Sequence, residues 1–170
     1  MAKIKIEDEA KIRPTIKVKN VPNPHTVYRE IREVLISRCG INPLNIDEKV
    51  YEHEKGNPEK IHIVLEAQKP KDKYTKLKFK IDVSMVLKPV NKKEIKYVGD
   101  VKISIKGTVE TTYPQNSKLQ KSILWDAFRG FYEKVLYGDL RDKYMEDCTN
   151  TIIKLRDAIQ AYFNLLPKMY

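Results

Sequence analysis

The segment KLKFKIDVSMVL, residues 76 to 87, alternates between apolar and mostly polar side chains. Its regularly spaced apolar members are Leu77, Phe79, Ile81, Val83, Met85 and Leu87. Because successive side chains of a strand point to opposite faces of a sheet, this period of two predicts a long strand with one buried face. The next run repeats the pattern with Ile95, Tyr97, Val101, Ile103, Ile105 and Val109. Together the two runs predict a long antiparallel hairpin at the centre of the fold, with its loop near residues 89–94.

Cross-strand pairs give a predicted register for this hairpin. The expected pairs are Val83 with Val101, Ile81 with Ile103, Asp82 with Lys102, and Val86 with Val98. These pairs are favourable on both faces of the sheet. Gly99 and Gly107 fall on the apolar face, where a missing side chain often marks a bulge or a bend. We therefore expect the sheet to be curved.

One strand and one helix are expected in the first 40 residues. Isoleucine and valine alternate with polar residues over residues 11–19, which predicts an edge strand. The helix is expected within residues 21–40, where Asn23 suits the N-cap and Pro24 the first helical position. Gly40 suits the position just past the helix end.

A second, shorter hairpin follows the helix. Residues 48–55 and 59–68 are typical of two strands joined by the turn Gly56-Asn57-Pro58. The inward side chains of the second strand are Ile61, Ile63, Leu65 and Ala67. The sequence thus predicts about five strands in all.

The period changes to that of a helix after residue 116. Ser117 can cap a helix whose apolar stripe comprises Leu119, Ile123, Ala127, Phe128, Phe131 and Val135. Gly138 and Asp139 supply a stop and a new cap, and a second apolar stripe continues to Leu166 before Pro167. Two helices are favoured over one helix kinked at Gly138.

The order of elements predicts an α+β fold for a single domain, residues 1–170. A curved antiparallel sheet of about five strands carries a short N-terminal helix and long C-terminal helices on one face. This order resembles the helix-grip fold of START-like proteins, in which a curved antiparallel sheet wraps a long C-terminal helix. The resemblance implies a cavity for an apolar ligand between the sheet and that helix.

Composition points to a basic cytoplasmic protein. The formal net charge is +10, and residues 61–113 alone contain 12 lysines against 6 acidic residues. No secretory signal and no membrane span are expected, because the N-terminus is charged and no long apolar run occurs. A charged fraction of 33% with only four glutamines also suits a heat-loving organism. The two cysteines, Cys39 and Cys148, are expected to be buried thiols.

The sequence favours a non-enzymatic protein without a cofactor or a metal. It contains no GxxxxGK[ST], GxGxxG or GxSxG motif, and no HExxH or CxxC spacing. His53 and His62 could approach each other across the second hairpin beside a glutamate such as Glu52 or Glu66. That arrangement leaves an enzyme as a third alternative.

The leading hypothesis is a binding or interaction protein that holds an apolar ligand between the curved sheet and the C-terminal helices. Gly99, Gly107 and Gly130 are expected to leave room beside the aromatic residues of the first C-terminal helix. The candidate site residues are Tyr97, Gly99, Trp125, Phe128 and Phe131. A protein partner, or a homodimer formed through the C-terminal helix, is an alternative occupant.

The second hypothesis is nucleic-acid binding by the polar face of the long hairpin. The candidate residues are Lys76, Lys78, Lys80, Lys102 and Lys106. Lysine neutralises phosphates, but this face has little beyond Tyr74 for base stacking, and residues 61–113 contain no arginine. A solvated, aggregation-resistant face is the simpler interpretation.

Overall fold

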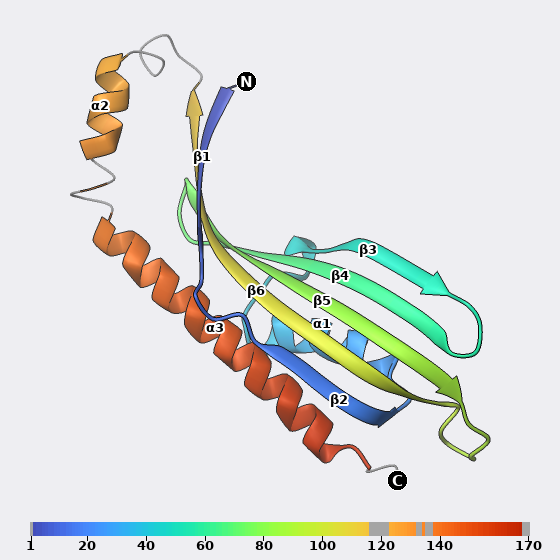
Figure 1. Ribbon diagram of the computed structural model, residues 1–170. Helices are drawn as coiled ribbons and strands as arrows, with labels where there is room; N and C mark the ends of the chain where they lie inside the picture. The colour runs from blue at the N-terminus through green and yellow to red at the C-terminus, as the bar shows by residue number, and fades with distance from the viewer. Residues whose placement is uncertain (1, 116–122, 132–133, 135–137, 168–170) are drawn as a thin grey trace.

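Six strands form one curved antiparallel sheet in the computed structural model of the protein (Figure 1). The structure describes residues 2–115, 123–131, 134 and 138–167. The strands are β1 (Ala2–Glu9), β2 (Thr15–Pro22), β3 (Ile46–Glu54), β4 (Glu59–Pro70), β5 (Thr75–Pro89) and β6 (Tyr97–Gln115). Their order is β1-β6-β5-β4-β3, and β2 pairs with another part of β6. The predicted α+β class, curved sheet and helix-covered face are confirmed, with six strands where about five were expected.

The additional strand is β1, which the sequence pattern concealed. Three consecutive acidic residues, Glu7, Asp8 and Glu9, interrupt the apolar alternation, but all three remain within the strand and pair with β6. Glu9 forms an ion pair with Lys106, a lysine of β6. An acidic run can therefore continue a strand when the neighbouring strand supplies the opposite charge.

In the central hairpin, each residue of β5 pairs with the β6 residue two positions C-terminal to its predicted partner. The observed pairs are Val83 with Ile103, Ile81 with Ile105, Asp82 with Ser104, and Val86 with Asp100. The register predicted from the sequence is therefore wrong. A shift by two residues keeps every side chain on its original face, so the apolar pattern could not distinguish the two registers.

Asn23 helps to fix the loop of that hairpin. The prediction that Asn23 caps the following helix is wrong. The helix α1 (Thr26–Ser37) follows His25 in the N-cap position. The Asn23 side chain accepts a hydrogen bond from the Lys96 amide at 3.0 Å and donates one to the Glu94 carbonyl at 3.0 Å. The loop therefore depends on a residue about seventy positions away in sequence, which local pairing rules do not consider.

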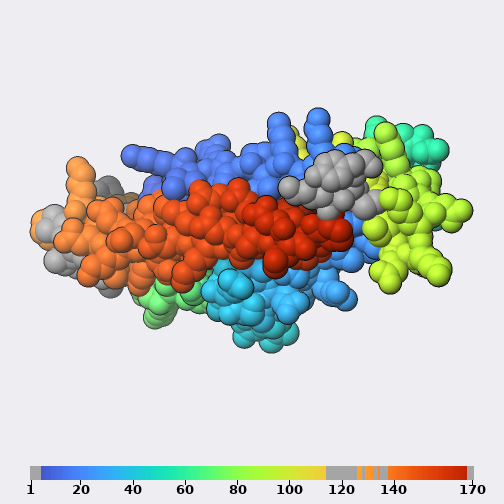
Figure 2. All heavy atoms as spheres, turned by 90° about the horizontal axis from the view of Figure 1, so that it is seen from below, coloured from blue at the N-terminus to red at the C-terminus, as the bar shows by residue number. Residues whose placement is uncertain are grey.

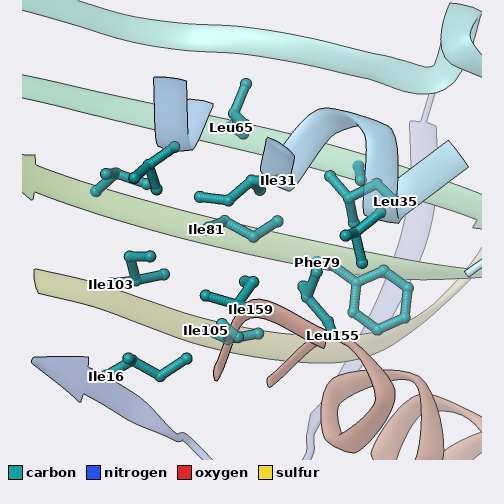
Figure 3. Close-up of a cluster of buried hydrophobic side chains, with 14 of the residues drawn as sticks. Ile16, Ile31, Leu35, Leu65, Phe79, Ile81, Ile103, Ile105, Leu155 and Ile159 are labelled. Atoms are coloured by element: carbon teal, nitrogen blue, oxygen red, sulfur yellow. The ribbon is translucent and has the colours of Figure 1, made fainter. Parts of the chain in front are cut away.

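Two helices pack on the inner face of the sheet, which is the face that carries Leu77, Phe79 and Ile81. They are α1 and α3 (Gly138–Leu165), and a short 3-10 helix, η1 (Pro43–Asn45), precedes β3. Figure 3 shows the core between these layers, with labelled side chains from α1, α3 and strands β2, β4, β5 and β6. The labelled residues are Ile16, Ile31, Leu35, Leu65, Phe79, Ile81, Ile103, Ile105, Leu155 and Ile159. All ten are buried.

Gly107 allows α3 to lie close against β6. A Cβ atom at this position would lie 2.6 Å from Cδ1 of Ile152 and 2.7 Å from Sγ of Cys148. The space expected for a ligand beside Gly107 is therefore occupied by two side chains of α3. Burial raises the pKa of the Cys148 thiol to about 11, so this cysteine acts as a small apolar group.

Among the described residues of the C-terminal region, α2 (Ile123–Phe131) and α3 are separate helices, as favoured from the sequence. The helix α2 leads into α3, and the two follow different directions (Figure 1). The predicted cap Ser117 and the stripe residues Leu119 and Val135 lie outside the described residues. None of the described helices is both long enough and apolar enough to cross a membrane.

Candidate functional site

A groove of about 360 Å³ lies between the edge strand β2 and the last turns of α3. Figures 1 and 2 show β2 and this part of α3 side by side. The lining residues are Thr15, Ile16, Lys17 and Val18 from β2, and Gln160, Phe163 and Asn164 from α3. The groove is therefore built by a sheet edge and a helix that are distant in sequence.

The floor of the groove is apolar and its rim is polar. Ile16 and Phe163 are 5% and 9% exposed, so both are anchored in the core. Gln160 and Asn164 are exposed on the helix side, and Lys17 is exposed on the strand side. A ligand would thus contact hydrogen-bonding groups at the edges and the small exposed parts of the apolar floor.

The backbone of β2 adds directional binding groups to this groove. β2 pairs only with β6 among the described strands. The Ile105 amide donates to the Pro14 carbonyl at 3.0 Å, so the backbone carbonyl of Pro14 faces β6. In an antiparallel pair, the backbone groups of successive residues point alternately toward the neighbouring strand and away from it. The backbone groups of Ile16 therefore face β6, and those of Thr15 and Lys17 face the open edge. An extended chain beside β2 could reach these backbone groups.

A hydrogen bond and a ring contact fix the helix end of the groove. The hydroxyl groups of Tyr162 and Thr26 lie 2.9 Å apart and share a hydrogen bond, which joins α3 to the start of α1. The ring of Tyr162 also packs against Phe163, with the ring centroids 5.6 Å apart. The hydrogen bond attaches the part of α3 that lines the groove to α1.

The predicted apolar-site residues whose side chains the structure describes do not come together. Tyr97 and Gly99 lie where β6 begins, whereas α2 follows the opposite end of β6 (Figure 1). A Cβ atom on Gly99 would lie 2.1 Å from the Val86 carbonyl oxygen, so this glycine permits close strand contact and leaves no space for a ligand. The side chain of Phe131 is 60% exposed. The side chains of Trp125 and Phe128 lie outside what the structure describes.

The predicted lysine row lies on the outer face of the sheet, where one buried glutamate neutralises part of it. Glu110 is only 5% exposed. Its carboxylate lies 3.5 Å from the Lys76 ammonium, 3.3 Å from that of Lys78 and 3.2 Å from that of Lys5. Burial alone would raise the pKa of Glu110, but the lysines more than offset this effect and hold the pKa at about 2.

The rest of the lysine row is interrupted by carboxylates. Lys106 pairs with Glu9, and Lys80 lies opposite Lys106 in the sheet. The shallow hollow around them also contains Glu7 and Glu66. Lys102 is exposed beside Ser84 and Lys17 on the neighbouring strands. The five lysines thus do not form a continuous positive track, and the structure gives no support to nucleic-acid binding.

The histidines considered as an alternative catalytic pair lie on opposite faces of the sheet. His53 pairs with Ile61, whose side chain is in the core, whereas His62 is the next residue along β4 and faces outward. His53 contacts Glu59 at 2.9 Å, and His62 contacts Asp82 at 3.0 Å. Within the described part of the chain, no group of three His, Cys, Asp or Glu side chains is placed to hold a metal ion.

Comparison with known proteins assigns no family to the chain. No protein-family model matches the sequence, and no curated protein matches it. A solved protein of unknown function from Staphylococcus aureus aligns over 93% of this chain and 98% of its own, with 8% identity and a TM-score of 0.28. Norcoclaurine synthase from Thalictrum flavum aligns over 96% and 91%, with 11% identity and a TM-score of 0.26. These scores are too low to support an argument about fold or function.

Sequence reasoning identified the components of the groove but not their assembly. Ile16 and Val18 belong to the predicted edge strand, and Phe163 lies within the stretch over which the second apolar stripe is predicted to continue to Leu166. No local pattern shows that these two elements are neighbours. Their contact follows from the pairing of β2 with β6 and from the direction of α3 across the sheet.

Proposed function

We propose that the protein is a non-enzymatic binding protein that holds an apolar ligand between the curved sheet and α3, in the groove beside β2. One observation carries this proposal: a groove with an apolar floor, Ile16 and Phe163, adjoins an open strand edge. Its volume of about 360 Å³ is in the usual range of ligand sites.

The ligand that fits this groove best is an extended peptide segment with apolar side chains. An exposed strand edge binds an extended chain through backbone hydrogen bonds, while neighbouring pockets select its side chains. The four residues from Thr15 to Val18 line the groove. At about 3.3 Å per residue, they span roughly 13 Å of an extended ligand. Alternate ligand side chains would then contact Phe163.

The chemistry of the lining supports binding more than catalysis. The described lining residues offer hydroxyl, amide and ammonium groups, but they include no carboxylate, imidazole or thiol side chain. Among the described lining residues, only Lys17 has a side chain of a kind that can act as a general base.

Selection of peptides from a phage-displayed random library tests this function. Peptides that bind the wild-type protein are then measured against Asn164→Trp, in which an indole fills the groove from an exposed position. We expect the affinity to fall at least about tenfold, because the ligand would lose its contact with the floor. Selected sequences should be rich in alternating apolar residues.

The matched control is Asn150→Trp, the same substitution at an exposed position of the same helix. The two sites are about 21 Å apart along α3, so this variant should bind as the wild type does. Failure to select any binding peptide, or equal binding by both variants, would contradict the proposed function.

A further inference from the structure

A second hollow lies away from the groove, beside the turn between β4 and β5. Its volume is about 550 Å³. The lining residues that matter are Lys5, Asp72, Lys73, Tyr74, Lys76 and Glu110. They come from β1, β5, β6 and the β4–β5 turn, so the hollow exists only once the outer strands have paired.

The hollow carries a surplus of positive charge. Its lining has three ammonium groups, on Lys5, Lys73 and Lys76, against the carboxylates of Asp72 and Glu110. Both oxygens of Asp72 already accept hydrogen bonds, from the amides of the β4–β5 turn and from a hydroxyl group of α3. The Glu110 carboxylate is shared by the ammonium groups of Lys5 and Lys76, and by that of Lys78 next to the hollow. Outside the lining, Glu7 also pairs with Lys5 at 2.6 Å. The lining itself has one ammonium group more than it has carboxylates, which favours one additional negative charge.

An aromatic wall borders the same hollow. The side chain of Tyr74 is 37% exposed, and its ring lies 5.3 Å from the ring of Tyr113, measured between centroids. The Lys73 ammonium lies 5.4 Å from the centroid of the Tyr74 ring. A flat apolar group could stack on the exposed part of Tyr74 while its acid group reaches the lysines.

We propose that this hollow binds a small organic monoanion with a flat apolar body, of the aromatic carboxylate class. The carboxylate of the ligand contacts Lys5 and Lys76, where it shares their ammonium groups with Glu110. The ring of the ligand lies against Tyr74. This site is separate from the groove between β2 and α3, and it does not depend on peptide binding there.

Titration calorimetry with naphthoate tests the proposal, with naphthol as the neutral analogue and inorganic phosphate as an anion without a ring. Naphthoate should bind, and both analogues should bind at least about tenfold more weakly, because each lacks one of the two contacts. Equal binding of naphthol, or no binding of naphthoate, would overturn the proposal.

Two substitutions should change the naphthoate affinity in opposite directions. Lys76→Gln removes an ammonium group and should weaken binding about tenfold, whereas Glu110→Gln removes the competing carboxylate and should strengthen it by a similar factor. Lys102→Gln, on the same face but outside the hollow, is the matched control and should change nothing. Equal affinities in all three variants would contradict the assigned position.

The exposed residue Tyr74 provides a second test if Glu110→Gln does not fold. Tyr74→Ala should keep the melting temperature within a few degrees of the wild type, because the side chain is partly exposed. It should also weaken naphthoate binding about tenfold. Unchanged affinity in a folded Tyr74→Ala protein would exclude the ring contact and with it the proposed ligand class.

Discussion

The two ends of helix α3 are held on the sheet in different ways. From residue 148 onward, α3 buries Cys148, Thr151, Ile152, Leu155, Ile159 and Phe163. Residues 138–147 are all described, and none of their side chains is fully buried. Apolar burial of about 25 cal/mol per Å² therefore stabilises the C-terminal part of α3 far more than the N-terminal part.

Polar contacts, together with the partly buried side chains of Tyr144 and Met145, hold the N-terminal part. The Tyr144 hydroxyl donates to Asp72 at 3.0 Å, and ion pairs join Asp147 to Lys71 and Arg141 to Asp8. Burial, with a further contribution from Asp72, raises the pKa of Tyr144 and keeps this donor protonated. Partly exposed ion pairs contribute about 0–1 kcal/mol each, so these contacts position the helix with little stability.

The difference explains why the groove belongs to the C-terminal part. A binding site keeps its shape only when its supporting residues are locked by packing, and Phe163 and Ile16 meet this condition. The N-terminal part of α3 can separate from the sheet at a lower cost in free energy. We therefore expect substitutions in the two parts to differ in size.

The largest expected effect is that of truncating leucine in the C-terminal part. Leu155→Ala should lower the free energy of unfolding by about 3 kcal/mol, because it leaves a cavity in the core. Leu140→Ala, the same change in the N-terminal part, should cost less than about 1 kcal/mol because Leu140 is only half-buried. Urea denaturation measures both values. Equal costs would show that the two parts are packed alike.

A substitution at the contact between β6 and α3 should have the next largest effect. Gly107→Ala should cost about 2 kcal/mol, because the new methyl group overlaps Ile152 and Cys148. Adding Ile152→Val removes the overlapping Cδ1 atom and should make the double variant more stable than the sum of the two single changes predicts. Gly130→Ala in α2 is the control, since nothing lies within 4 Å of a Cβ atom there. A fully additive double variant would exclude this contact.

A fall in pH should lower the stability of the end of the sheet that lies nearest the N-terminal part of α3. The pKa of Glu110 is lowered from 4.5 to about 2, so its ion pairs stabilise the fold above pH 4.5 and are lost as the pH falls toward 2. Allowing for screening around half-exposed lysines, we expect a loss of roughly 2 kcal/mol over this range. Glu110→Gln should remove this part of the pH dependence. An unchanged pH profile in that variant would contradict the assignment.

The smallest expected effect is that of an ion pair in the N-terminal part. Lys71→Asp and Asp147→Lys should each destabilise the protein by less than about 1 kcal/mol, and the double exchange should restore most of the loss. Thermal denaturation of the four proteins gives the coupling energy. A coupling well above 1 kcal/mol would show that polar contacts anchor this part as firmly as apolar packing anchors the other.

The sequence predicts the buried faces of the C-terminal part of α3 and of the two strands of the central hairpin, because periodic burial determines both. The alternation in β5 and β6 and the helical spacing of Ile152, Leu155 and Ile159 follow directly from one buried face. Contacts between charged residues carry no such periodicity. The strand at Glu7 to Glu9, and the three lysines around Glu110, therefore became visible only in the structure.

The register and the groove depend on contacts between distant segments. A two-residue slip of β6 satisfies the same apolar pattern, and the position of Asn23 beside the hairpin loop is a tertiary feature. The groove likewise requires β2 and α3 to be neighbours. Sequence periodicity assigns residues to faces, but it does not determine which elements meet.

Native-state hydrogen exchange of the full chain compares the two parts of α3 most directly. The amides of residues 151–163 should exchange nearly as slowly as those of the central strands β5 and β6, because they open only when the core unfolds. The amides of residues 142–147 should exchange faster, with opening free energies at least about 2 kcal/mol lower. Equal protection along the whole of α3 would contradict the claim that packing holds one end of the helix and polar contacts hold the other.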